Sequence, residues 1–271
     1  MSFGETVILG AIAGLTIFVG LPFARMSSGS PGLRTLLSGV SAGILVFLLF
    51  DILGHATAPV EEALTGHDWA QLTLLGLVYV AGLGLGLLGL LYAQRWAGPP
   101  RPGAGPGAMA LAEAEPPTAG SDALRLGMVI ATGIGLHNFS EGLVIGQSAA
   151  SGAVSLALLL IIGFALHNAT EGFGIVGPLV AIGVRPTWRW LALAGLIGGG
   201  PTFVGTVLGT AVSSPILFVA FLALAAGAIL YVVGELIVAG RRASWELTLW
   251  GIFVGFLFGL ATDLILVAAG G

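Results

Sequence analysis

One six-residue pattern occurs twice in the sequence, as His137-Asn138-Phe139-Ser140-Glu141-Gly142 and as His167-Asn168-Ala169-Thr170-Glu171-Gly172, each time inside a long apolar stretch. If each stretch is helical, His and Glu stand at i and i+4, and Asn and Glu at i and i+3. All three side chains then project from one helix face. The two copies therefore predict neighbouring membrane helices with a polar site between them.

The composition outside these copies is that of an integral membrane protein. Mean hydropathy is +1.04, hydrophobic residues make up 56% of the chain, and charged residues only 8%. Apolar stretches of about 20 residues, enough to cross roughly 30 Å of hydrocarbon, predict eight spans. They lie near 4–24, 33–54, 70–93, 123–149, 153–180, 187–211, 215–239 and 245–268. These stretches are too long and continuous for barrel strands, so the predicted class is all-α.

The positions of the basic residues predict the orientation. The chain has no lysine, and its nine basic residues are Arg25, Arg34, Arg95, Arg101, Arg125, Arg185, Arg189, Arg241 and Arg242. They fall after the first, third, fifth and seventh predicted spans, so these loops are expected in the cytoplasm and both termini outside. The acidic segment with Glu61, Glu62, His67 and Asp68 is then an outer loop. We expect a multi-pass protein of the plasma membrane, the inner membrane in a bacterium.

Several other classes are excluded or disfavoured. The absence of cysteine removes disulfides, thiolate ligands and cysteine nucleophiles. The net charge of −4 reflects outer acids and inner arginines and predicts no nucleic-acid partner. The first span lacks a basic segment before it, so no cleaved signal peptide is expected.

Weak internal repeats predict a symmetric organisation. The segment Ser41–Leu53 aligns without gaps to Ala225–Ile237, and Phe18-Val19-Gly20 recurs as Phe203-Val204-Gly205. An offset of five helices inverts the topology, as in carriers with a site near the membrane midplane. Chance similarity between apolar helices is the alternative. The predicted arrangement is 3+2+3: helices one to three (1–96), a disordered Pro/Gly-rich cytoplasmic linker (97–122), helices four and five (123–181), and helices six to eight (182–271).

The chemistry of the repeated pattern points to a divalent cation. An ionised carboxylate at the centre of a membrane helix costs roughly 2.5–3.5 kcal/mol, and two close carboxylates also repel each other. A metal ion would neutralise both, with imidazole nitrogens and carboxamide oxygens as further ligands. Such mixed ligation suits Zn²⁺, Mn²⁺, Fe²⁺, Co²⁺ or Cd²⁺ better than Ca²⁺ or Mg²⁺. The predicted metal ligands are His137, Asn138, Glu141, His167, Asn168 and Glu171.

Other interpretations of the pattern remain open. The side chains could hydrogen-bond the helices together, relay protons without a metal, or hold a bis-histidine haem. The haem would leave both glutamates unexplained. A membrane-embedded hydrolase with a metal-activated water is the competing class, and it would need an open coordination position and a substrate groove. The pattern is not His-Glu-x-x-His, so a zincin protease is not indicated.

Four residues are second-rank candidates along a metal path. Asp51 is expected near the outer end of its helix and Glu235 near the inner end of the seventh, at opposite mouths. His55 stands one turn from Asp51, so it is either an outer ligand or a hydrogen-bonded histidine at the membrane interface. Asp263 lies in the eighth predicted span.

These residues resemble the ZIP (Zrt/Irt-like) metal transporters. The tandem His-Asn-x-x-Glu-Gly motif after a variable linker is similar to theirs, most closely in the GufA-like branch. The segment Gly227–Ile237 resembles that branch's seventh-helix signature, and Asp263 falls where its eighth helix carries an acid. The resemblance implies uptake of divalent metal toward the cytosol, an elevator-like movement of a bundle containing helices four and five, and a homodimer. It also implies a transporter rather than an enzyme.

The sequence departs from that family at three places. Ser140 and Thr170 stand where proline is usual, and their hydroxyls bend a helix more weakly than proline does. Gly200-Pro201 replaces a glutamate before proline, which favours one metal rather than a bridged pair. The linker lacks histidines. The predicted function is transport of a divalent transition metal, with Zn²⁺ as the favoured cargo.

Overall fold

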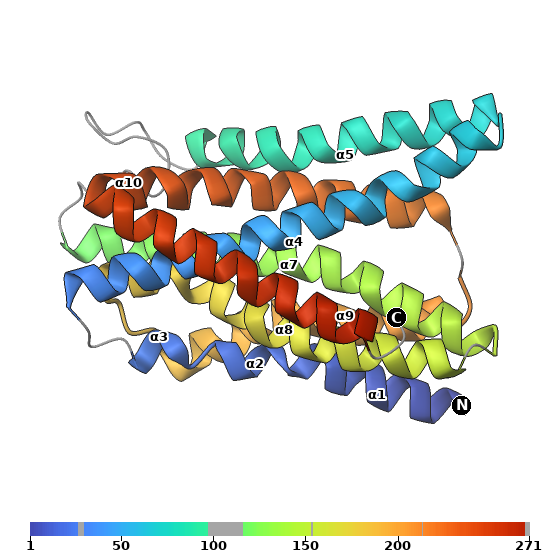
Figure 1. The fold of residues 1–271 in the computed structure, drawn as a ribbon, viewed down its shortest axis with the longest axis horizontal. Coiled ribbons are helices and arrows are strands. Elements are labelled where there is room, and N and C mark those ends of the chain that lie inside the picture. The colour runs from blue at the N-terminus through green and yellow to red at the C-terminus, as the bar shows by residue number, and fades with distance from the viewer. Residues whose placement is uncertain (27–29, 97–115, 153, 213, 269–271) are drawn as a thin grey trace.

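The computed structural model describes residues 1–26, 30–96, 116–152, 154–212 and 214–268, and every regular element in these ranges is helical (Figure 1). The elements are α1 (Phe3–Leu15), α2 (Ile17–Gly20), α3 (Phe23–Met26), α4 (Pro31–Thr65), α5 (Trp69–Trp96), α7 (Pro116–Ala150), α8 (Val154–Ile182), α9 (Trp188–Gly209) and α10 (Pro215–Ala268). The predicted all-α class is confirmed.

Seven helical segments in the described ranges are long and apolar enough to cross a membrane. The first, Phe3–Arg25, joins α1, α2 and α3, and the last, Pro215–Ile265, includes most of α10. At 1.5 Å per residue, each segment exceeds the roughly 30 Å of hydrocarbon in a bilayer. The chain is therefore a multi-pass helical membrane protein. The count of eight separate spans stays a prediction.

The helix α10 is interrupted near its middle. Ser244 has extended backbone angles, φ −166° and ψ 111°, inside an element of 54 residues. Figure 1 shows the red ribbon reversing direction there, so residues 215–243 (the first arm) and 245–268 (the second arm) run antiparallel. The hydroxyl of Thr248 donates to the Ser244 carbonyl at 2.7 Å, which holds the start of the second arm.

Two helix boundaries differ from the sequence-based expectation. Glu61 and Glu62 lie inside α4 rather than in an outer loop, because two good helix formers, Ala63 and Leu64, follow them before Gly66 ends the helix. The helix α7 begins at Pro116, so the end of the expected linker is helical, since proline is tolerated in a first turn. The rest of that linker, 97–115, lies outside the described residues.

Glycines allow the helices around α7 and α8 to approach closely. A Cβ added at Gly142 would meet the backbone of Thr202 in α9, and one added at Gly172 would meet the backbone of Ile17 in α2. Such contacts between small residues are the usual way that membrane helices pack. They bring α1, α2, α7, α8 and α9 against one another around the repeated polar pattern.

Candidate functional site

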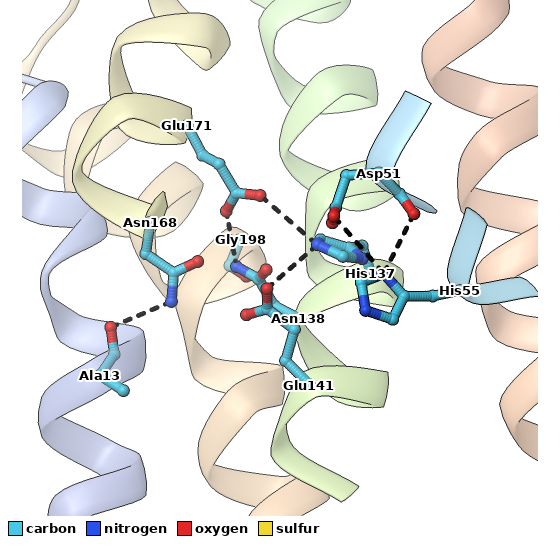
Figure 2. Close-up of polar contacts among 9 residues, drawn as sticks. All are labelled: Ala13, Asp51, His55, His137, Asn138, Glu141, Asn168, Glu171 and Gly198. Carbon is cyan, nitrogen blue, oxygen red and sulfur yellow. Dashed lines mark hydrogen bonds and ion pairs between the residues drawn. The ribbon is translucent and has the colours of Figure 1, made fainter. Parts of the chain in front are cut away.

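The repeated pattern lies in the interior, on facing sides of α7 and α8 (Figure 2). The described side chains are almost fully buried, with exposed fractions of 2% for His137, 5% for Glu141, and 0% for Asn138, Asn168 and Glu171. Because the pattern residues are three and four positions apart, each helix directs its polar side chains to one face. Buried groups of this kind require partners, since neither water nor lipid can satisfy them here.

The imidazole of His137 faces carboxylates from both helices. Its Nε2 atom lies 3.1 Å from Oε1 of Glu141 and 3.9 Å from Oε1 of Glu171. A single donor nitrogen thus stands between two acids, one from its own helix and one from α8. The two carboxylates are close enough to share one positive group.

Two asparagine amides are held by backbone carbonyls of flanking helices. The Nδ2 atom of Asn138 donates to Oε2 of Glu171 and to the Gly198 carbonyl of α9, both at 3.0 Å. The Nδ2 atom of Asn168 donates to the Ala13 carbonyl of α1 at 3.0 Å. These bonds determine how each carboxamide is oriented, and sequence analysis missed both carbonyl partners.

The same bonds leave an oxygen of each asparagine available. Oδ1 of Asn138 and Oδ1 of Asn168 are buried and have no hydrogen-bond partner within the part of the chain that the structure describes. In Figure 2 the Oδ1 atom of Asn168 is turned toward the side of Glu171. A buried acceptor without a donor is destabilising unless something else satisfies it, and a cation would do so.

Replacing Asn138 with alanine is expected to lower the free energy of unfolding by about 2–3 kcal/mol. The change removes two buried hydrogen bonds, one of them to a carboxylate. Thermal unfolding in detergent measures the effect. The matched control is Gln147→Ala, which removes one exposed carboxamide bond to the Val212 carbonyl and should cost below about 1 kcal/mol. Equal losses for the two variants would contradict a buried role for Asn138.

The structure places the other predicted site residues as follows. His167 lies in α8, and its side chain is outside the described part of the structure. Nδ1 of His55 lies 3.5 Å from Oδ1 of Asp51, and the two side chains are 62% and 22% exposed. Figure 2 shows this pair beside His137. The helix α4 continues to Thr65, so the expectation that Asp51 lies near the end of its helix is wrong.

Two further candidates lie on the two arms of α10. Glu235 in the first arm is 7% exposed and stands one turn after Tyr231, whose phenol hydrogen-bonds with it. Asp263 is in the second arm and is partly exposed. Glu235 was selected from the sequence through its match to Asp51 in the repeat, and its place on a metal path stays a prediction.

Among the described residues, no group of three or more His, Cys, Asp or Glu side chains is arranged to hold a metal ion. Instead, Nε2 of His137 contacts Glu141, and Asn138 hydrogen-bonds with Glu171. A cation entering here would have to displace contacts between the protein's own donors.

Long apolar helices that enclose buried histidine, asparagine and glutamate side chains define a multi-pass membrane protein with a polar interior site. The family model described as ZIP Zinc transporter matches residues 110–262, more than half of the chain and the whole of the repeated pattern. The chain therefore belongs to the ZIP family of zinc transporters. A comparison with curated proteins finds no match. ZIP proteins are transporters rather than enzymes, and a divalent metal ion is the class of substrate that this membership supports.

Proposed function

We propose that this protein carries a divalent transition metal, Zn²⁺ first, toward the cytosol through a site near the membrane midplane. The ligands would be His137, Asn138, Glu141, His167, Asn168 and Glu171. One observation supports this most directly: Nε2 of His137 stands between two buried carboxylates. In addition, the Oδ1 atoms of Asn138 and Asn168 are buried and have no hydrogen-bond partner among the described residues. Cd²⁺, Mn²⁺, Fe²⁺ and Co²⁺ fit the same donors and are further candidates.

The cation would act by replacing contacts between these donors. It would separate His137 from Glu141, draw both carboxylates to itself, and satisfy the two asparagine oxygens. No cysteine is available in the sequence, so nitrogen and oxygen are the only donors. When the metal leaves toward the cytosol, the His137 contact with the glutamates would form again and compensate the buried charges.

The path would run past acids on either side of this site. Asp51 and His55 would receive the metal from outside and pass it to His137, since Figure 2 shows the three side chains together. Glu235 would serve the inner side, and Asp263, near the end of the second arm, would lie toward the outer side. We propose the GufA-like branch of the family for this chain because Gly227–Ile237 resembles that branch's seventh helix.

Packing contacts support inverted repeats around the site. Figure 1 shows α4 and the first arm of α10 running in opposite directions. A Cβ at matched positions would meet matched backbone atoms: the nitrogen of Phe256 and carbonyl of Ile252 for Gly43, and the nitrogen of Leu87 and carbonyl of Leu83 for Gly227. The spacing that relates Asp51 to Glu235 also relates these two glycines.

The asparagine bonds follow the same symmetry. Asn138 and Asn168 occupy the same position in the two copies of the repeated pattern. Their acceptors, Gly198 and Ala13, are separated by the same number of residues as Phe203 and Phe18 of the repeated triplet. This agreement supports the 3+2+3 arrangement, with the two arms of α10 as the seventh and eighth spans. Outer termini, the plasma membrane, alternating access and a homodimer complete the proposal.

Uptake into proteoliposomes tests the function. We expect time-dependent accumulation of Zn²⁺ and Cd²⁺ with the wild-type chain and at least about tenfold slower uptake with Glu141→Ala/Glu171→Ala, because the carboxylates provide the negative charge that binds the cation. Protein density is matched, and Glu61→Ala/Glu62→Ala in α4 is the control. Equal uptake by the site variant would reject the site. No uptake by either protein, despite bound metal, would favour the membrane-embedded hydrolase.

Metal binding should weaken as the pH falls. Protons and the cation compete for the same carboxylate and imidazole lone pairs, so binding must release protons. The apparent affinity for Zn²⁺ is expected to fall about tenfold per pH unit for each proton displaced as the solution is acidified. Titrations of the purified protein at pH 7.5 and 5.5 measure it. An affinity independent of pH would contradict ligation by these residues.

A further inference from the structure

A buried hydroxyl without a partner stands in α9, one turn from the carbonyl that holds Asn138. Thr202 is 0% exposed, and its Oγ1 atom has no hydrogen-bond partner among the described residues. A buried threonine in a helix usually donates to the carbonyl of the preceding turn. Thr206, one turn further along α9, does so: its hydroxyl donates to the Thr202 carbonyl at 2.8 Å. Within the described structure, the hydroxyl of Thr202 makes no bond of this kind.

The carbonyl that Thr202 would use is occupied by Asn138. Four residues before Thr202 stands Gly198, whose carbonyl accepts from Nδ2 of Asn138 at 3.0 Å. A carbonyl oxygen has two lone pairs, and inside an α-helix one of them belongs to the N–H group four residues on. The asparagine takes the other. The Thr202 hydroxyl is therefore without an acceptor because Asn138 has the place that it would fill.

Asn138 faces Glu171 with its nitrogen rather than with its oxygen. Its Nδ2 atom donates to Oε2 of Glu171 at 3.0 Å, and its Oδ1 atom has no partner among the described residues. The NH₂ group of a carboxamide only donates hydrogen bonds, so the carboxamide must turn to bring Oδ1 to a cation bound by Glu171. That turn takes Nδ2 away from the Gly198 carbonyl. A buried carbonyl left without this donor would oppose metal binding.

Asn168, the matching residue of the second copy, needs no such turn. Its Nδ2 atom donates to the Ala13 carbonyl at 3.0 Å, and Figure 2 shows its Oδ1 atom turned toward the side of Glu171. The Ala13 carbonyl also accepts from the hydroxyl of Thr16 at 2.6 Å. A threonine thus stands within one turn of each carbonyl that holds an asparagine. The hydroxyl is already bonded at Ala13, whereas at Gly198 the asparagine has its place.

We infer that Thr202 is a positioning residue for metal binding. When Asn138 turns its oxygen to the cation, the Thr202 hydroxyl rotates about χ1 and donates to the Gly198 carbonyl in place of the asparagine. Threonine in a helix adopts two χ1 rotamers, so this exchange of donors needs no movement of the backbone. It offsets the cost of breaking the bond between Asn138 and Gly198. This role rests on the proposed function, because it requires Asn138 to be a metal ligand.

A double-mutant cycle on the metal-free, full-length protein tests the exchange of donors. In the wild-type background Thr202→Val removes a hydroxyl that has no described partner, so the melting temperature in detergent should stay the same or rise. In the Asn138→Ala background the Gly198 carbonyl depends on that hydroxyl. Adding Thr202→Val there should lower the melting temperature by about 2 °C or more. Additive effects of the two changes would overturn the inference.

Titration of the purified protein with Zn²⁺ tests whether metal binding uses this exchange. Thr202→Val should bind Zn²⁺ about tenfold more weakly than the wild type, since its metal-bound state contains a buried carbonyl without a donor. Thr202→Ser keeps the hydroxyl and should bind like the wild type. The matched control is Thr206→Val, equally buried in the same helix but with its hydroxyl already bonded. It should lower the melting temperature in both backgrounds and leave the affinity unchanged.

The titrations also separate failure of this role from failure of the proposed site. If Glu171→Ala binds Zn²⁺ weakly while Thr202→Val binds it as tightly as the wild type, Thr202 has no part in metal binding and the proposed site stands. If Glu171→Ala binds as tightly as the wild type, the proposed site is rejected, and the role of Thr202 with it. A loss of affinity in Thr202→Val that Thr202→Ser shares would point to packing rather than to the hydroxyl, and would also overturn the inference.

Discussion

Replacing Glu171 with alanine is expected to lower the affinity of the purified protein for Zn²⁺ by about 100-fold or more. Even partners that only orient a metal ligand are worth about 10- to 100-fold in affinity, and Glu171 is proposed to bind the ion directly. Its side chain is 0% exposed, accepts a hydrogen bond from Asn138, and lies 3.9 Å from Nε2 of His137. Isothermal titration calorimetry measures the loss.

One further variant separates charge from shape at this position, and a second, in α4, is the control. Glu171→Gln keeps the volume and an acceptor for Asn138 but removes the negative charge, so it should fold well and still bind weakly. Glu62→Ala removes an exposed acid of α4 and should leave affinity unchanged. If Glu171→Gln bound Zn²⁺ as tightly as the wild type, Glu171 would have a structural role only.

Replacing Gly142 with leucine is expected to prevent correct assembly of the helices, at a cost of about 3 kcal/mol or more. A Cβ at this position would meet the Thr202 carbonyl, the Thr206 nitrogen and the Gly205 Cα, all backbone atoms that cannot turn away. Overpacking of a close contact is destabilising even where side chains can adjust. The monodisperse fraction in size-exclusion chromatography and the melting temperature report the result.

The matched control for this change is Gly84→Leu in α5. A Cβ there meets nothing within 4 Å, so the same substitution adds an apolar side chain to open space. Gly84→Leu should therefore purify and melt like the wild type. Similar behaviour of the two variants would mean that α7 and α9 do not approach as closely as described.

The periodicity of the repeated pattern predicted the local part of the site. Residues at i and i+4 of a helix are neighbours, and His137 and Glu141 meet at 3.1 Å as expected. The apolar stretches predicted the all-helical class. Helix ends were predicted less well: α4 continues past Glu61 and Glu62 to Thr65, because local preferences for helix extend a span beyond its apolar part.

Other features of the site depend on segments far apart in the chain. The pattern did not predict that Asn138 would hydrogen-bond with Glu171 and Gly198, or that Asn168 would hydrogen-bond with Ala13. It also did not place Asp51 beside His137. These contacts join α1, α4, α7, α8 and α9, and their geometry follows from how closely the helices pack.

The sequence by itself thus determined that this is a helical membrane protein with asparagine and glutamate directed inward from two helices and His137 from one of them, because hydropathy and helical spacing are local properties. Only the tertiary structure decided which carbonyls hold the asparagines and which carboxylates face His137. A backbone carbonyl is the same in every residue. Ala13 and Gly198 became acceptors because their helices lie against α8 and α7, where glycines such as Gly172 and Gly142 permit close approach.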